Sequence, residues 1–144
     1  MRAGGRGFKS RPVHYSLYGY GDEALIVIKI NEKEAFRTID GSEVIEVIGL
    51  KSMGMRRLSI AIAKVRGHTR TLKHRHSFLE VYYIEKGKGI MHIEEEERLV
   101  CKGDFIVIPE GHLHYIENVE DDDLIIWCIC VPAFTFEGTK LEEH

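Results

Sequence analysis

Three histidines and one glutamate stand at spacings that can hold a metal ion. His74 and His76 are separated by one residue, Glu80 follows four residues later, and His114 lies further along the chain. On a β-strand the first three positions share one face, because side chains alternate between the two faces. Neighbours on that face lie about 6.5–7 Å apart, so two imidazoles can converge on one ion. A neighbouring strand must then supply His114.

Neutral imidazoles and a carboxylate select a particular group of ions. Three imidazoles with one carboxylate suit Fe, Mn, Ni, Zn or Cu better than Ca, which prefers oxygen ligands. Such a set leaves one or two positions of an octahedral ion open, where substrate, water or O₂ can bind. We therefore predict one divalent metal ion per subunit and a small-molecule substrate. The sequence leaves the identity of the ion open.

Glycines and a proline flank these four residues at regular offsets. The first segment contains Gly67, His74, His76, Glu80 and Gly87, and the second contains Gly103, Pro109, Gly111, His114 and Asn118. These spacings resemble the two motifs of the cupin superfamily, except that six residues rather than five separate Gly67 from His74. The resemblance covers about a third of the chain. It implies a jelly-roll β-barrel that encloses a metal held by His74, His76, Glu80 and His114.

The remainder of the chain indicates short strands between turns. Strands are expected at residues 24–30, 44–48, 57–65, 80–85, 105–108, 115–118 and 124–131, with a hairpin over residues 89–100 whose turn is 94–97. Only residues 52–57 could form a short helix. The predicted fold class is all-β, a double-stranded β-helix or jelly-roll barrel with at most a short helix. Residues 21–144 would form this single domain.

Residues 1–20 are predicted to form a flexible basic arm. Residues 1–12 are rich in Gly and Arg and offer too little apolar surface to order themselves. A basic arm that grips RNA or a partner subunit is the alternative. The formal net charge of -3 gives no overall field that attracts nucleic acid. No helix-turn-helix pattern accompanies the arm, so we do not expect nucleic-acid binding.

Length and composition predict a cytoplasmic protein. The chain has 144 residues, which corresponds to one domain. No stretch reaches the roughly 18 apolar residues that a membrane helix needs, so no membrane association is expected. The three cysteines do not form a disulfide framework, and reduced thiols in a cytosol are the simpler interpretation. Cys128 and Cys130 are expected to be small buried residues.

The segment LIIWCICV at residues 124–131 predicts a second subunit. A strand with one face in water should carry a polar residue at every second position, but this one is apolar throughout. One face can fill the barrel interior, whereas the other needs a cover. We therefore expect a homodimer.

Four side chains are candidates for contact with a substrate beside the metal. These are Phe78, Tyr82, Arg70 and Phe105. The aromatic residues could shape a pocket. If Arg70 or Lys73 points into the mouth of the site, an anionic substrate such as a carboxylate or phosphate is favoured. A solvated basic loop is the alternative.

Three functions remain open, because one fold hosts many activities. The full set of three histidines and a glutamate favours a metalloenzyme with oxygenase-type chemistry, dependent on Fe or Mn. A metal-dependent sugar-phosphate isomerase or epimerase is the second possibility. A non-catalytic module that binds a metal or ligand is the third. The sequence identifies no catalytic residue beyond the metal ligands.

Overall fold

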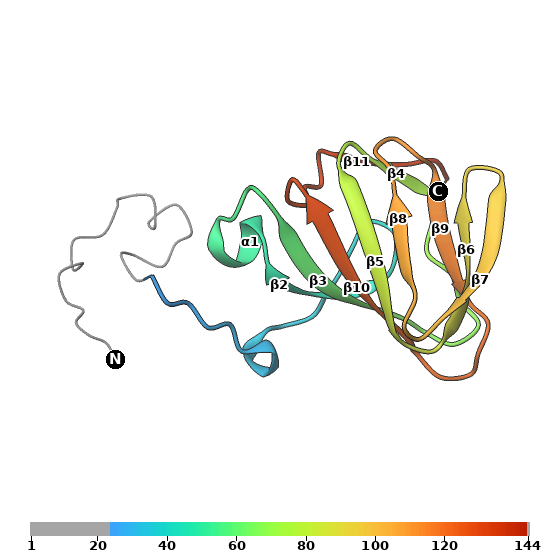
Figure 1. The fold of residues 1–144 in the computed structure, drawn as a ribbon, viewed down its shortest axis with the longest axis horizontal. Helices are drawn as coiled ribbons and strands as arrows, with labels where there is room; N and C mark the ends of the chain where they lie inside the picture. The colour runs from blue at the N-terminus through green and yellow to red at the C-terminus, as the bar shows by residue number, and fades with distance from the viewer. Residues whose placement is uncertain (1–23, 144) are drawn as a thin grey trace.

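Two antiparallel β-sheets face each other and enclose the interior of the protein (Figure 1). This computed structural model describes residues 24–143. The six-stranded sheet has the order β1-β2-β3-β10-β5-β8, and the five-stranded sheet has the order β11-β4-β9-β6-β7. The fold is therefore the predicted all-β jelly roll. The predicted arm at residues 1–20 lies outside the described residues.

The two sheets take strands from all parts of the described chain. The six-stranded sheet contains β1 (Phe36–Arg37), β2 (Glu43–Ile48), β3 (Ser59–Val65), β10 (Leu124–Val131), β5 (Leu79–Lys86) and β8 (Phe105–Ile108). The five-stranded sheet contains β11 (Thr139–Leu141), β4 (His74–His76), β9 (His114–Asn118), β6 (Lys88–Ile93) and β7 (Glu96–Cys101). Although β4 and β5 are almost contiguous in sequence, they belong to different sheets.

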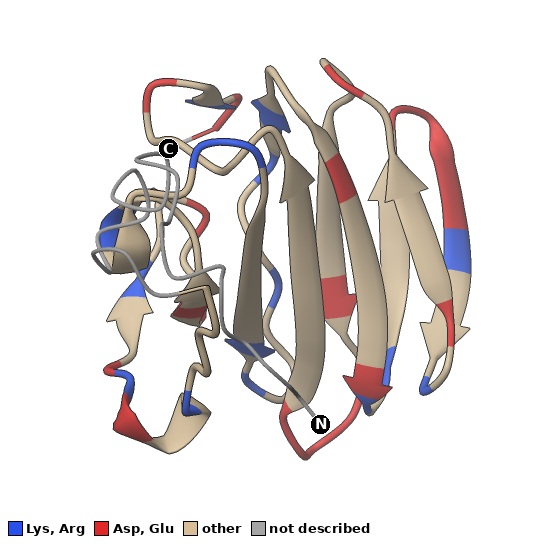
Figure 2. Ribbon diagram, turned by 60° about the vertical axis from the view of Figure 1, so that its left-hand side comes forward, with Lys and Arg blue, Asp and Glu red and all other residues tan. Residues whose placement is uncertain are grey.

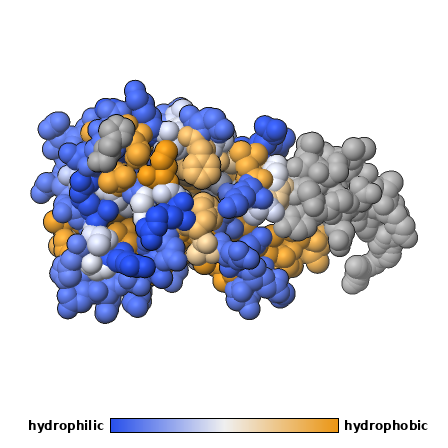
Figure 3. All heavy atoms as spheres, turned by 180° about the vertical axis from the view of Figure 1, so that it is seen from behind, coloured by the Kyte–Doolittle hydropathy of each residue, from blue (hydrophilic) through white to orange (hydrophobic). Residues whose placement is uncertain are grey.

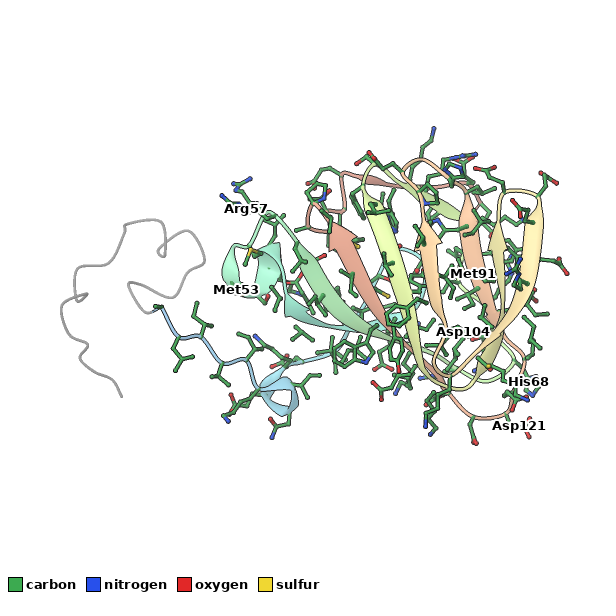
Figure 4. The ribbon with its side chains drawn as sticks, in the orientation of Figure 1. Met53, Arg57, His68, Met91, Asp104 and Asp121 are labelled. Atoms are coloured by element: carbon green, nitrogen blue, oxygen red, sulfur yellow. The ribbon has the colours of Figure 1, made fainter. Side chains whose placement is uncertain are left out.

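The main core lies between the two sheets. Ile84, Ile116, Leu124 and Ile126 are at most 1% exposed, and they come from both sheets. Met91 of β6 also points into this interior (Figure 4). Burying one side chain of this size contributes about 1.5–3 kcal/mol. The core therefore holds the two sheets at a fixed separation on one side of the site.

Strand β3 has a small face and a large face, as its sequence predicts. Ser59, Ala63 and Val65 are buried, whereas Ile60 and Ile62 alternate with them on the outer face. Small inward side chains occupy little of the volume between the sheets. The interior beside β3 is therefore left partly open, and a cavity lies there.

The structure corrects two predicted boundaries. The short helix α1 spans Leu50–Met53, earlier than the predicted 52–57, because Gly54 adopts a left-handed conformation (φ 70°) and ends it. Strand β7 begins at Glu96, so the hairpin turn is shorter than the predicted 94–97. No helix within the described residues is long and apolar enough to cross a membrane.

The predicted strand at residues 24–30 is wrong for the described chain. These residues extend away from the two sheets (Figure 1) and lead into the 3₁₀ helix η3 (Ile30–Glu32). Leu25 is 82% exposed and Val27 is 68% exposed. In Figure 3, hydrophobic atoms accordingly lie next to the grey ones, where the described chain begins. The β-branched pattern is present, but the segment pairs with no sheet edge within residues 24–143.

Candidate metal centre

Four buried side chains from three strands meet between the sheets. His74 and His76 lie on β4, His114 lies on β9, and Glu80 lies on β5. One potential ligand atom from each lies within 4.8 Å of all the others. None of the four residues is more than 5% exposed. The structure thus brings the predicted ligands together into a group, here called the tetrad, that can hold a metal ion.

The four side chains of the tetrad approach one another from both sheets rather than along one face of a single strand. His74 and His76 share the inward face of β4, as predicted. Glu80, however, is not on that strand, because residues 77–78 carry the chain across to the six-stranded sheet. Glu80 therefore approaches from the opposite side. His114 does come from the neighbouring strand, where it is the direct register partner of His74.

Backbone carbonyl groups orient two of the histidines. His74 Nδ1 lies 2.7 Å from the carbonyl oxygen of Leu72, and His114 Nδ1 lies 2.9 Å from that of His112. A carbonyl can only accept, so each Nδ1 carries the hydrogen and donates it. The Nε2 atoms of both rings therefore keep a free lone pair that faces the centre of the tetrad.

A pair of threonine contacts orients the third histidine. His76 Nδ1 lies 2.9 Å from the hydroxyl of Thr139, and that hydroxyl donates to the carbonyl of Thr135 at 3.0 Å. Because the single hydroxyl hydrogen is already used, Thr139 can only accept from His76 Nδ1–H. All three Nε2 atoms are thus free to bind a metal ion. Neither Thr139 nor the two carbonyls carries a sequence signal for this role.

Replacing Thr139 with valine is expected to weaken metal binding without removing a ligand. The loss of the acceptor frees the His76 ring to rotate and to change tautomer, and such losses typically reduce metal affinity about 10–100-fold. The affinity is measured by competition with a chelating dye. The matched control, Thr139→Ser, keeps the hydroxyl and should bind as the unchanged protein does. Equal affinities of the valine and serine variants would contradict this role.

Two buried atoms of the tetrad lack a hydrogen-bond partner. These are Glu80 Oε1 and His114 Nε2, which lie 3.4 Å apart. With the hydrogen of His114 placed at Nδ1, both atoms are acceptors, and two facing acceptors without a donor are costly in a buried site. A cation placed between them satisfies both. The donor set therefore fits a divalent ion.

The charge states of the tetrad also suit such an ion. Burial lowers the pKa of His74 to about 4, and repulsion from His114 acts in the same direction. Burial alone would raise the pKa of Glu80, but the adjacent His114 and His76 rings outweigh this effect and hold the pKa well below its ordinary value. At neutral pH the site therefore offers a neutral imidazole at His74 and an ionised carboxylate at Glu80.

The two cysteines of β10 lie outside the tetrad, and Cys130 is buried as predicted whereas Cys128 is only partly buried. Burial raises the pKa of Cys128 and of Cys130 well above the ordinary value, and the charge of Glu80 adds to this effect. Both thiols therefore stay protonated at neutral pH. Cys130 Sγ lies 3.5 Å from Glu80 Oε2 and donates to it. This contact supports the second oxygen of the glutamate.

A cavity of about 60 Å³ lies beside the tetrad. Its wall includes Ser59, Ala61, Ala63 and Val65 of β3, Tyr82 of β5, and Asp40 of the loop between β1 and β2, together with His74, His76 and Glu80. The small residues of β3 create this space. A small molecule could therefore reach the tetrad from within the jelly roll.

Two of the four predicted substrate-contact residues lie near the tetrad. Tyr82 lines the cavity, and burial raises its pKa well above the ordinary value, so its hydroxyl stays protonated. Phe78 is 2% exposed and stacks on the His76 ring with a centroid separation of 4.5 Å. Phe78 thus packs against a candidate ligand, although it is not part of the cavity wall described above.

The structure places the other two, Arg70 and Phe105, away from the cavity. Arg70 forms an ion pair with Glu143 at 2.7 Å, outside the cavity wall. Phe105 is 67% exposed, because it is the register partner of Tyr83 and shares its outward face. The inward position on this part of β5 belongs to Tyr82. Neither Arg70 nor Phe105 is therefore in place to contact a molecule in this cavity.

The basic side chains of the loop before β4, residues 67–73, also lie outside the cavity wall. His68 pairs with Asp121 at 2.6 Å, and the two side chains lie side by side at one end of the molecule (Figure 4). The Lys73 ammonium lies 5.5 Å from the centre of the Tyr115 ring. Neither His68 nor Lys73 lines the cavity. An anionic substrate was expected only if Arg70 or Lys73 pointed into the mouth of the site, and neither of them lines the cavity.

Comparison with known proteins gives a match to a family model and a relative that is matched over most of both chains. The cupin domain model matches residues 61–131, which include the whole tetrad. The uncharacterized protein MJ1618 of Methanocaldococcus jannaschii is 33% identical over 120 residues, which are 83% of this chain and 96% of that protein. The resemblance found from the two motifs is confirmed.

Solved structures share the fold at lower identity. The oxalate decarboxylase of Bacillus subtilis matches with a TM-score of 0.68 and 16% identity, over 83% of this chain but only 33% of that one. The chain thus spans about a third of the length of that enzyme. A predicted oxalate decarboxylase of Thermotoga maritima matches with a TM-score of 0.63 and 24% identity, over 74% of this chain and 99% of that one. The chain belongs to the cupin superfamily.

Proposed function

We propose that this cupin binds one divalent ion, Fe or Mn, at the tetrad and supports oxygenase-type chemistry on a small molecule. The observation that carries the proposal is the orientation of the tetrad. Hydrogen bonds at Nδ1 leave three Nε2 atoms free, and these face Glu80 beside a cavity. Four protein donors leave open positions on an octahedral ion. Mn(II) centres are named for the Bacillus subtilis oxalate decarboxylase, a cupin with the same fold.

The residues around the tetrad have definite tasks in this proposal. When bound, the ion supplies a Lewis acid and, for Fe or Mn, a redox centre. The apolar side chains of β3 exclude bulk water from the cavity, which strengthens electrostatic interactions inside it. The protonated hydroxyl of Tyr82 can donate a hydrogen bond within the cavity.

A sugar-phosphate isomerase is less well supported. A phosphate group needs basic side chains or a helix N-terminus near the metal. Within residues 24–143, no Lys or Arg lines the cavity, and Arg70 is paired with Glu143 outside it. The basic loop that made this function plausible from the sequence therefore does not serve the site.

The test is oxygen uptake by Fe(II)-loaded protein. Protein prepared without oxygen is mixed with aerated buffer and a phenol, a β-diketone or an amino alcohol, and uptake is followed with an oxygen electrode. We expect uptake that depends on the added compound and is absent from the Zn(II)-loaded protein, since Zn has no redox chemistry. No uptake above the Zn(II) control with any compound would contradict the oxygenase proposal, as would aldose–ketose interconversion without uptake.

We further propose that a second copy of the chain covers the outer face of the six-stranded sheet. Two rows of apolar side chains cross this face, one formed by Ile45, Ile62, Trp127, Tyr83 and Phe105 and the other by Ile60, Ile129, Val81 and Val107. Figure 2 shows long uncharged stretches on these strands. Packing this face against its own copy brings apolar rows together, in the manner of aligned sheets.

Val107→Lys is expected to convert the homodimer into a monomer. Val107 is 61% exposed within one chain, so the lysine costs the monomer little but places a charge inside the proposed interface. Analytical ultracentrifugation measures the change. Val119→Lys is the control, because Val119 is also exposed (37%) but follows β9 of the other sheet and belongs to neither row. A monomeric unmodified protein, or dissociation by both variants alike, would contradict this interface.

We also propose a cytoplasmic location. Cys101, Cys128 and Cys130 are all free thiols in the structure. Reduced cysteines are the usual state in a cytosol. When the protein is taken directly from cells and unfolded, a thiol reagent should therefore modify all three cysteines. Intermolecular disulfides would count against this location.

A further inference from the structure

The wall of the cavity beside the tetrad carries three carboxylates but, among the residues that the structure describes, no Lys or Arg. Three carboxylates line it: Asp40, Glu46 and Glu80. Among residues 24–143, no Lys or Arg side chain does so. One divalent ion compensates two of these three negative charges, so an excess of negative charge remains. A cavity of low polarity that carries residual negative charge disfavours an anionic ligand and favours a cationic one.

Asp40 is fixed so that one of its oxygens faces this space. Its Oδ1 accepts hydrogen bonds from Ser42 N at 2.9 Å, from Ser42 Oγ at 2.7 Å, and from the Thr38 hydroxyl. Oδ2 has no such donor within the described chain, and its nearest polar neighbour in the tetrad is His74 Nε2 at 3.7 Å. The side chain of Asp40 is only 13% exposed. A rigid, nearly buried carboxylate therefore presents one free oxygen beside the metal position.

Asp40 is not simply a fifth ligand of the ion. The atoms of the tetrad all lie within 4.8 Å of one another, and Asp40 is not part of that group. It stands next to the His74 edge of the tetrad instead. Glu46 is also less free than Asp40, because its Oε2 accepts from the backbone N–H of Ser52. Asp40 Oδ2 is thus the acceptor in the cavity wall that is best placed for a bound molecule.

We propose that the cavity takes a small molecule with a protonated amino group, which donates to Asp40 Oδ2 while the rest of the molecule faces the tetrad. This inference rests on the proposed function and names its substrate class. A dicarboxylate is disfavoured there, because its second carboxylate would meet Asp40 with no Lys or Arg of residues 24–143 in the cavity wall to compensate it. Aromatic side chains at Tyr82 and Phe134 complete a lining that suits an alkylammonium ion.

The test compares an amine with an acid of similar size. Zn(II)-loaded protein is titrated by calorimetry with ethylammonium and with acetate, and the same titrations are made on Asp40→Asn. We expect tighter binding of ethylammonium than of acetate by the unchanged protein. The ratio of the dissociation constants of ethylammonium and acetate should shift at least about tenfold in favour of acetate in Asp40→Asn, because the amide removes a hydrogen bond between two charged groups.

Two controls separate the substrate class from metal binding. Glu43→Gln changes a carboxylate at the start of β2 that pairs with Lys64 outside the cavity, and it should leave both titrations unchanged. Metal content is measured for every variant, and Asp40→Asn should still bind one ion. Preference of the unchanged protein for acetate, or a ratio that Asp40→Asn does not move, overturns the inference while the metal proposal stands. If the protein binds no metal, the proposed function is overturned instead. The preference of the metal-free protein for ethylammonium over acetate then still tests the inference.

Discussion

His114→Ala is expected to remove metal binding almost completely. The Nε2 atom of His114 is buried without a hydrogen-bond partner and lies 3.4 Å from Glu80 Oε1, so an ion there would lose a central ligand. The loss of a direct ligand should exceed the roughly 10–100-fold effect of removing a group that only orients one. Elemental analysis of protein handled without oxygen should fall from about one ion per chain to a trace.

Thermal unfolding provides the second readout for His114→Ala. An ion present at about 1,000 times its dissociation constant stabilises the folded state by about 4 kcal/mol, so excess metal should raise the Tm of the unchanged protein and not that of the variant. His92→Ala is the matched control, because His92 pairs with Glu117 on the outer side of β6 and takes no part in the tetrad. If His114→Ala keeps its ion and its metal-dependent Tm shift, the metal site is assigned to the wrong residues.

Gly67→Ala is expected to destabilise the fold by about 3 kcal/mol or more, at the upper end of the cost of overpacking. A Cβ at this position would lie 2.1 Å from the backbone oxygen of Asp121 and 2.8 Å from that of Glu120. Backbone atoms cannot turn aside as a long side chain can, so the loop that contains Gly67 and the turn that contains Glu120 and Asp121 must separate. The free energy of unfolding is measured by urea denaturation.

Gly103→Ala is the control for the effect of a positive φ alone. A Cβ there meets no atom within 4 Å, but φ is 95°, which an alanine adopts at a cost of about 1–2 kcal/mol. The crowded position should therefore be the more damaging of the two. Equal losses of unfolding free energy in the two variants would show that the close approach of Gly67 to Asp121 does not fix the position of this loop.

The sequence predicted the residues of the tetrad because two patterns pointed to them. Alternation on a strand placed His74, His76 and Glu80 on one face, and the glycine and proline spacings resembled two cupin motifs that contain all four residues. The interior of β3 was also predictable, since small and large residues alternate there. What the sequence could not show was that the chain changes sheets between His76 and Glu80.

The remaining site residues depend on contacts that no local pattern records. Asp40 belongs to none of the predicted strands, and its place in the cavity wall results from the packing of the loop between β1 and β2 against Leu72 and His74. Thr139 acts through one hydrogen bond to a residue far away in sequence. Phe105 was misplaced because the strand FIVI is apolar at every position, so its alternation does not reveal which face is inward.

The division of the tetrad between two sheets has a mechanical consequence. Three ligands belong to the five-stranded sheet and one to the six-stranded sheet, and the β4–β5 connection is short. A bound ion would therefore cross-link the two walls of the jelly roll, much as a disulfide joins two segments. Amide hydrogen exchange in β4, β9 and β5 should then slow together when metal is added, because opening of either sheet requires the same ion to dissociate.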